Sequence, residues 1–496
     1  MSATAVSPPS QPFPQAFPQP FPQQSPSAWH TPLAQPAQEF PTTPLRILSG
    51  QVPAGLQGAY YQNGTGRLAR GGEPVGHWFD GDGAILRVGF GEGKVTGTYR
   101  YVQTAGYRAE SAAHKFLYGN YGMRYPGPLW EHMAKILKGT SIKNSANTSV
   151  LALPDKLLAL WEGGNPHSLN LESLETLGQE SLGWLKSGQP FSAHPLQDPL
   201  SGEIYNIGVN AQCDLAIYRC DAACHLIKKA VIPLKDVPLV HSFVMAGPYL
   251  VFLISPVKIN LLPLLFNQQS YADSIEWRAE RGTKIIVVDR ESLEIVSQGR
   301  TDPWFQWHYG NGCVDADGNV RLDFARFDDF THINQVLREV PTGKVKTVAH
   351  GKLHQLRINP KTGQVLSNEC VIDRHCEFPQ VPASQVGQPW NVTYLIMHRD
   401  GAATGQDWFG TLGRFDYASD TLTTVDLGEG YYGSEPLYVA DRMSPERGWL
   451  LAVVYNSHET QSELWIFDAQ AIAEPVCRLA LPSLIPLGFH GTWRAA

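Results

Sequence analysis

The sequence predicts an all-β protein, built as a propeller, a sandwich or a barrel. Short apolar runs of strand length, such as residues 284–288, 449–455 and 463–467, recur along the chain. Asp-Gly and Thr-Gly turn signals stand between such runs, for example at residues 82–83, 317–318 and 362–363. This alternation is typical of antiparallel sheets joined by hairpins. We find no clear sequence repeat, so the three architectures stay open at this point.

The first segment of the chain is not expected to join the core. Residues 1–40 are rich in Pro, Gln and Ser, which predicts a disordered, mobile tail with polyproline II character. They lack the basic start and apolar stretch of a signal peptide. Residues 41–496 are expected to form a single β-rich domain.

The composition excludes some classes of function. Apolar residues make up 43% of the chain and charged residues 17%, which suits a large core. The formal net charge is −7, so we expect no nucleic-acid partner. The seven cysteines form no C-x-x-C pair, which indicates reduced thiols and a cytoplasmic location.

Two further segments carry their own signals. Residues 126–138 show the one convincing helical period, with Lys135 and Lys138 away from the apolar face. Residues 237–257 are long enough for a transmembrane helix and contain one titratable group, His241. Prolines interrupt that segment, so we predict two buried strands joined by a turn at residues 246–248.

Four of the sixteen histidines stand out, namely His194, His241, His308 and His490. Each lies in or beside a strand-like run. The inner strands of propeller blades would bring such distant residues together on one axis, since a blade takes roughly 40–50 residues or more. Four neutral imidazoles that meet would bind a divalent metal. The alternative is that each is an ordinary core or surface histidine in a large β-rich protein.

Seven short motifs occur in order along the chain: HWFDGDG (77–83), KNSANT (143–148), LALWEGG (158–164), SAHP (192–195), CEFP (376–379), SEP (434–436) and HGTW (490–493). With these motifs the chain resembles the carotenoid cleavage oxygenase family, and within it the cyanobacterial apocarotenoid oxygenases. The resemblance runs from about residue 50 to the C-terminus, roughly nine-tenths of the chain.

The resemblance implies a seven-bladed β-propeller, with a dome of loops and short helices over a metal site on the axis. It implies that the four histidines bind a non-haem Fe(II). His308 departs somewhat from the family pattern, because its neighbours are Trp307 and Tyr309, although Asn311 stands where the family often has an asparagine.

The resemblance also assigns residues around the metal. Carboxylates that accept the second N–H of a metal-bound imidazole orient the ligand. The matching residues are Glu162, Glu377 and Glu435, each of which could instead be a surface turn residue. Thr148 matches a residue whose methyl group lies against one open coordination position, so it is expected to steer O₂ to the other.

The implied reaction is cleavage of a conjugated C=C bond by O₂, which gives two carbonyl products, such as a retinal-like aldehyde from an apocarotenoid. The chain would then be an iron dioxygenase. A long apolar polyene needs a tunnel lined by aromatic side chains. The candidates are Trp161, Phe243, Phe305 and Trp307, with ordinary core packing as the alternative for each.

Such a substrate lives in membranes, so we expect peripheral contact with a bilayer. The helix within residues 126–138 and the apolar run 261–266 are the segments that would dip into its surface, unless they pack on the propeller. Charged residues in place of Leu264 and Leu265 are then expected to lower liposome binding while the iron content holds.

Three other functions stay open. Stilbene-cleaving relatives grip a phenol with a tyrosine and a lysine, and Tyr107 and Lys143 lie in comparable stretches. A retinyl-ester isomerohydrolase would release no cleaved aldehyde and need no O₂, but Thr148 argues against it. A propeller that only binds a partner would contain no iron.

Overall fold

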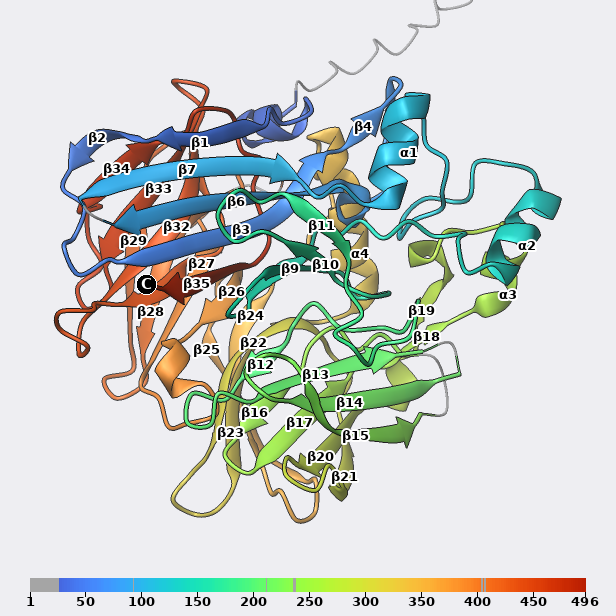
Figure 1. Cartoon of the computed structure of the whole chain (residues 1–496). Helices are drawn as coiled ribbons and strands as arrows, with labels where there is room; N and C mark the ends of the chain where they lie inside the picture. Colours follow the sequence, from blue (N-terminus) through green and yellow to red (C-terminus); the bar gives the residue numbers. More distant parts are fainter. Residues whose placement is uncertain (1–25, 92, 211, 235–237, 403–404, 406) are drawn as a thin grey trace, which may run out of the picture.

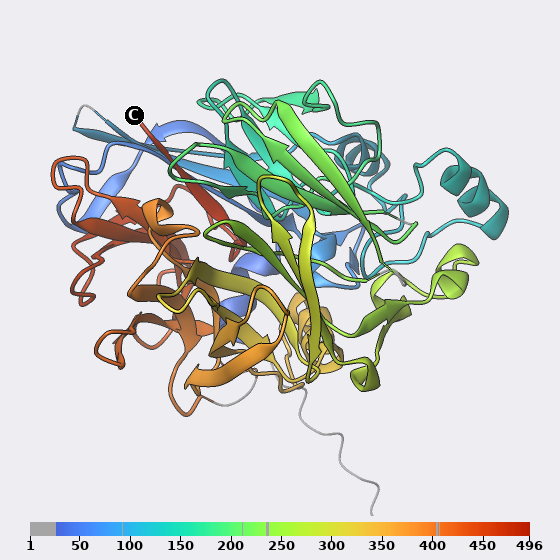
Figure 2. The same ribbon diagram turned by 90° about the horizontal axis from the view of Figure 1, so that it is seen from below.

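The computed structural model describes residues 26–91, 93–210, 212–234, 238–402, 405 and 407–496. Seven β-sheets surround one axis in the part of the chain that is described. The colours of the chain follow one another around the molecule until the red C-terminal segment lies beside the blue N-terminal one (Figure 1, Figure 2). The predicted all-β class and the seven-bladed propeller are confirmed.

Two blades combine strands from both ends of the chain, which closes the ring. One has the order β1-β7-β6-β3-β35, with β1 (Phe40–Pro44), β3 (Gly58–Arg67), β6 (Asp82–Gly91), β7 (Lys94–Tyr101) and β35 (Gly491–Ala495). The other contains β2 (Arg46–Gly50), β30 (Tyr431–Gly433), β31 (Leu437–Ala440), β32 (Gly448–Asn456), β33 (Gln461–Asp468) and β34 (Cys477–Ala480).

The other five blades are four-stranded antiparallel sheets formed by consecutive segments. The first two contain β8 (Ser149–Ala152), β9 (Leu157–Leu160), β10 (His167–Leu169), β11 (Thr176–Gln179), then β12 (Leu196–Gln197), β13 (Ile204–Val209), β14 (Asp214–Cys220) and β15 (Leu226–Pro233). The next contains β16 (Val244–Ala246), β17 (Tyr249–Ile254), β20 (Thr283–Asp289) and β21 (Ile295–Thr301). The last two contain β22 (Phe305–Val314), β23 (Val320–Phe327), β24 (Lys352–Ile358), β25 (Val365–Ile372), then β26 (Cys376–Gln380), β27 (Val392–His398), β28 (Phe409–Asp416) and β29 (Thr421–Asp426).

The hydrophobic core lies between neighbouring blades. Alternate side chains of β17 show why its sequence is apolar throughout. Leu250 and Phe252 pack with residues of β13 and β14, whereas Val251 and Leu253 pack with residues of β22–β24. A strand buried on both faces needs a continuous apolar run. The predicted strand pair β16 and β17 is confirmed, with Gly247 at a φ of +56° in the turn between them; residue 237 of that segment lies outside the described residues.

Helices and small sheets lie on one side of the ring, at the right of Figure 1. They are α1 (Ala105–Ala113), α2 (Leu129–Leu137), α3 (Leu261–Leu265), α4 (Phe330–Glu339), the pair β4 (Ala69–Arg70) and β5 (Glu73–Pro74), and the pair β18 (Val257–Ile259) and β19 (Ile275–Trp277). Single 3₁₀ turns are η1 (Ala28–Leu33), η2 (Trp78–Asp80), η3 (Ala272–Ser274), η4 (Ala279–Arg281), η5 (Val340–Thr342) and η6 (Ala383–Gln385).

The helix predicted within residues 126–138 is α2, and α4 is a further helix whose period was not recognised in the sequence. Asp329 caps α4 by accepting a hydrogen bond from the His332 N–H at 2.8 Å. The buried face of α4 includes Phe330, Ile333 and Leu337. A helix of 10 residues repeats this spacing too few times for the period to stand out in the sequence. Among the described residues no helix is long and apolar enough to cross a bilayer.

The predicted tail boundary at residue 40 is also wrong. Trp29 is fully buried and stacks on Trp408, with ring centroids 4.9 Å apart. Its indole N–H donates to the Gly405 carbonyl at 3.4 Å. Two large aromatic rings that bury each other explain why residues 26–33, here called the N-terminal arm, join the propeller despite the proline-rich sequence before them. Residues 1–25 of the predicted tail lie outside the described residues.

Candidate metal centre

The four predicted histidines converge on the propeller axis. His308 lies within β22, and His194, His241 and His490 stand just before β12, β16 and β35, each the strand at one edge of its sheet. One ligand nitrogen from each ring lies within 4.8 Å of the other three. The ring centroids of His194 and His241 are 4.3 Å apart, and those of His308 and His490 are 4.6 Å apart.

The three predicted glutamates lie behind three of these rings. Glu377 Oε2 is 2.6 Å from Nδ1 of His308, and Glu435 Oε1 is 2.8 Å from Nδ1 of His490. The Glu162 carboxylate contacts Nδ1 of His241. Glu377 and Glu435 accept the Nδ1 proton of their rings and so leave a lone pair on Nε2, and Glu162 lies where it can do the same for His241.

This arrangement fits a cation. Burial and mutual repulsion among the rings lower the pKa of His194 and His308 well below the ordinary value, so both are neutral near pH 7. His241 Nε2 and His308 Nε2 are 3.2 Å apart although both carry lone pairs. Nε2 of His194 is buried without a partner among the described residues. Two nitrogens bound at right angles to one ion at about 2.1 Å are about 3 Å apart, so a divalent metal satisfies all three observations.

Irregular backbone aims the side chains of β22 and β26. The pairing of β22 with β23 shifts register around His308, as expected for a β-bulge that redirects a side chain. In β26, Phe378 has a φ of +54°, which is costly for a residue with a side chain. Its N–H donates to Glu377 Oε2 at 2.8 Å and its ring stacks on His308 at 4.9 Å. These contacts hold the strained residue in place.

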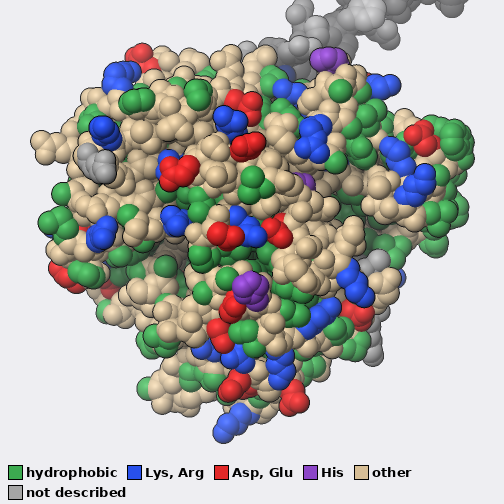
Figure 3. Space-filling view, in the orientation of Figure 1, with side chains coloured by type: hydrophobic (Ala, Val, Ile, Leu, Met, Phe, Trp, Pro, Cys, Tyr) green, Lys and Arg blue, Asp and Glu red, His purple; other side chains and the backbone are tan. Residues whose placement is uncertain are grey.

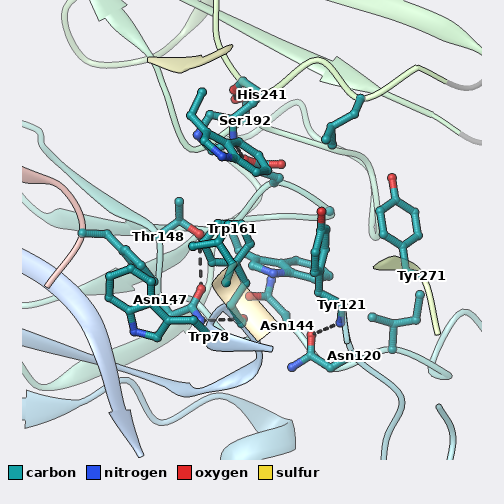
Figure 4. A pocket seen from close by; sticks show the side chains of 18 of the residues that line it. Trp78, Asn120, Tyr121, Asn144, Asn147, Thr148, Trp161, Ser192, His241 and Tyr271 are labelled. Atoms are coloured by element: carbon teal, nitrogen blue, oxygen red, sulfur yellow. Dashed lines mark hydrogen bonds and ion pairs between the residues drawn. The ribbon is translucent and has the colours of Figure 1, made fainter. Parts of the chain in front are cut away.

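Three of the four histidines, His241, His308 and His490, open onto a cavity of about 1050 Å³. Figure 4 shows Trp161, Thr148 and His241 on its wall, with Tyr121 and Tyr271 further along. Twelve aromatic side chains lie on this wall: Trp78, Phe79, Tyr118, Tyr121, Trp161, Tyr271, Trp307, Phe327, Phe378, Trp408, Phe409 and Phe489. Such a lining suits a flat, apolar ligand.

The structure separates the four residues predicted to line a tunnel. Trp161 and Trp307 lie on the cavity wall. Phe243 and Phe305 do not, and the prediction is wrong for these two. Phe243 packs on Phe252 between two sheets, and Phe305 packs against the far side of Trp307 in the core.

Several wall residues were missed although the sequence held a signal for them. Phe378 and Phe489 directly adjoin Glu377 and His490, and Phe79 belongs to the HWFDGDG motif. Adjacency in sequence to a metal-site residue was therefore informative at these positions as well. Trp408 and Phe409 carry no such signal.

Tyr107 and Lys143 do not face the cavity as a pair, because Lys143 lies on its wall and Tyr107 does not. The Lys143 ammonium donates to Asp82 and Glu110, each at 3.0 Å, and all three side chains are buried. The Tyr107 ring stacks on Tyr101 at 5.1 Å and is absent from the cavity wall. The lysine is thus held in a structural ion-pair network.

Comparisons with known proteins agree with the fold and identify the family. The family described as retinal pigment epithelial membrane protein matches residues 33–495. The apocarotenoid-15,15'-oxygenase of Synechocystis sp. is 31% identical over 90% of this chain and 92% of its own length. Resveratrol cleavage oxygenase 1 of Aspergillus fumigatus is 22% identical over 90% of this chain and 91% of its own. The crystal structure of the cobalt-substituted Synechocystis apocarotenoid oxygenase superposes with a TM-score of 0.85 at 29% identity, over 95% of this chain and 98% of that one.

Proposed function

Because the chain belongs to the family of the retinal pigment epithelial membrane protein and the carotenoid cleavage oxygenases, we propose that it is a non-haem Fe(II) dioxygenase that cleaves a conjugated C=C bond of an apocarotenoid. The single observation that carries the proposal is the convergence of four imidazoles, three of which, those of His241, His308 and His490, lie on the wall of a cavity rich in aromatic side chains. A polyene bound in this cavity would contact the metal ligands on its wall.

In the proposed reaction the double bond and O₂ give two carbonyl groups, so each product receives one oxygen atom and no further reductant is needed. Fe(II) held by His194, His241, His308 and His490 would supply the redox chemistry that O₂ requires. The chain does the rest. Its glutamates hold the imidazole protons on Nδ1, so that Nε2 of each ring is free to face the metal. Its aromatic wall positions one double bond and excludes water.

We assign Thr148 to the space beside the ligands. Its carbonyl accepts a hydrogen bond from the His490 N–H at 3.3 Å, and the residue lies on the cavity wall. Its hydroxyl donates to Asn147 at 3.2 Å. The side chain is thus fixed next to His490 and restricts where O₂ fits.

A hydroxystilbene is the second substrate class, because a stilbene-cleaving relative aligns over most of the chain. The ion pairs of Lys143 weigh against it, since a lysine shared by two buried carboxylates has little freedom to bind a phenol oxygen. We therefore place the apocarotenoid first.

The apolar surface of α2 and α3 is proposed to take substrate from a bilayer. Leu137, Trp130 and Leu262 are 88%, 73% and 66% exposed, and the projecting lobe at the right of Figure 3 is largely hydrophobic. Leu261 and Leu264 also line the cavity, so this surface lies at its mouth. Apolar side chains beside lysines are typical of interfacial anchors.

The test is to purify the protein, measure its iron, and offer a β-apocarotenal and a hydroxystilbene in air and without O₂. We expect bound iron and an O₂-dependent retinal-like aldehyde from the apocarotenal. His241→Ala is expected to lose both iron and product. His354→Ala, on β24 outside the cavity, should keep both. A benzaldehyde from the stilbene as the sole product would overturn the substrate, and a protein that takes up no iron would overturn the activity.

A further inference from the structure

A second histidine cluster lies on the wall of the same cavity, away from the metal centre. It comprises His375 and His398, with His350 at the exposed rim. The ring centroids of His375 and His398 are 4.3 Å apart, and His350 stacks on His375 at 5.5 Å. Neither the fold nor the proposed metal chemistry requires these three rings.

Two phenylalanine rings connect this cluster to the metal centre. Phe378 stacks on His308, and the Phe409 ring lies 6.1 Å from Phe378. Phe409 in turn lies 5.0 Å from His398 and 5.6 Å from His375. An elongated ligand that reaches His308 along this wall therefore has its far end at the second cluster.

The cluster is not a second metal site. In the part of the chain that is described, no other group of three or more His, Cys, Asp or Glu side chains brings its ligand atoms together as the central histidines do. His375 uses Nδ1 to accept the Gly351 N–H at 2.7 Å, so its proton lies on Nε2. That nitrogen is a hydrogen-bond donor rather than a metal ligand.

The rings offer neutral hydrogen bonds inside an apolar wall. Burial lowers the pKa of His375 to about 3, and burial next to His375 holds the pKa of His398 well below the ordinary value. The ring nitrogens of His398 have no hydrogen-bond partner among the described residues, whereas Trp408 and Phe409 pack around them. These nitrogens are available to bond a ligand oxygen, because His398 lies on the cavity wall.

The two nearby cations, Arg374 and Arg399, do not lie on the cavity wall. Asp407 accepts from Arg399, and Arg399 also donates to the Tyr431 carbonyl at 2.6 Å. Arg374 donates to the His398 carbonyl at 2.9 Å. A carboxylate at this position would meet the Asp407 carboxylate on the cavity wall and neither arginine, whereas a hydroxyl or carbonyl oxygen needs no cation.

We infer that His375 and His398 bind an uncharged oxygen, a hydroxyl or a carbonyl, at one end of the substrate while the reacting double bond lies at the four-histidine centre. This inference rests on the proposed function, because it takes a polyene as the ligand. It makes His398 a residue that sets specificity for the end group and the register of the polyene, with no part in the chemistry at the metal.

The test measures binding and cleavage separately. Three probes are an apocarotenal, the same molecule with a hydroxyl on its ring, and an oxygen-free polyene of equal length. Binding is followed by quenching of tryptophan fluorescence, which needs no turnover. His398→Phe should weaken binding of at least one oxygenated probe about three- to tenfold, which is the effect of one neutral hydrogen bond. The dissociation constant of the oxygen-free polyene should change by less than about twofold.

Two further variants keep the result interpretable. His398→Gln retains a donor and should restore most of the preference, and His354→Phe, outside the cavity, should leave it unchanged. In the cleavage assay the loss should appear in KM and not in kcat, with the iron content constant. Equal effects of His398→Phe on all three probes, or no effect on any, would overturn the inference.

The outcomes also separate this inference from the proposed function. A wild-type protein that binds the probes with an oxygen preference but cleaves none would overturn the proposed function and leave the end-group site standing. If the wild-type protein cleaves the apocarotenal and His398→Phe keeps the preference for oxygenated probes, the end-group inference fails and the proposed function stands. A protein that binds none of the probes would overturn both.

Discussion

Trp29→Ala is expected to destabilise the whole propeller, although residue 29 lies in the segment that the composition marks as a tail. Trp29 is fully buried, stacks on Trp408 and donates to Gly405. The substitution removes the largest side chain of the N-terminal arm. It also exposes the back of Trp408, whose other side faces the cavity.

The size of the effect follows from these contacts. Truncation of a buried tryptophan to alanine costs about 3–5 kcal/mol. The loss of folding free energy cannot exceed the net stabilisation that the docked arm provides, because an arm that detaches regains its conformational entropy. Unfolding entropy is about 2.1 cal/mol/K per residue, which gives about 1 kcal/mol/K for a domain of this length. The expected fall in Tm is therefore about 3–5 °C.

Differential scanning fluorimetry measures this shift, and Trp130→Ala on α2 is the matched control. Trp130 is 73% exposed, so the same truncation should change Tm by less than about 1 °C. Limited proteolysis reports whether cleavage near the arm becomes faster in Trp29→Ala alone. Equal shifts in the two variants, or no shift in Trp29→Ala, would refute the reasoning that the arm is part of the folded domain.

Three more outcomes are expected. Glu435→Gln, which places an amide against the His490 and Gly491 N–H groups, should lower iron affinity about 10–100-fold in a chelator competition; unchanged affinity would remove the glutamate from the metal site. Burial raises the pKa of Asp80 to about 7, above its unfolded value, so its contribution to stability is complete below about pH 4 and is lost as the pH rises through 7. Asp80→Asn should therefore raise Tm at pH 8 and flatten the profile of Tm against pH, and parallel profiles would contradict this. Leu262→Asp should weaken binding to phosphatidylcholine liposomes about tenfold with the iron content unchanged, whereas Leu200→Asp, at a leucine that is even more exposed, should not; equal losses would indicate a non-specific effect.

The sequence predicted the parts of the site that lie within short motifs. The four histidines and three glutamates were found through the family resemblance, and the structure brings all seven side chains together. Spacing alone would not have found them, because sixteen histidines allow many sets of four.

The tunnel was harder to predict because strand alternation fails near the metal. In a regular strand Trp307 and His308 would point to opposite faces. The register shift in β22 brings both to the cavity and leaves Phe305 in the core. Phe243 precedes β16 and so follows no alternation at all. The second histidine cluster joins segments before β24 and β26 with the end of β27, a juxtaposition that only the blade packing creates.

The strained residue Phe378 ties the metal centre to the cavity. Its N–H fixes Glu377, its ring stacks on His308, and the same ring forms the wall that leads through Phe409 to His398. A left-handed φ at a bulky residue persists only when the surrounding contacts over-determine it. The orientation of a metal ligand and the shape of the substrate path thus depend on one side chain. For this reason a substitution of Phe378 that alters substrate fit also moves the metal ligand His308. A substitution of His398 can alter substrate fit and leave His308 in place.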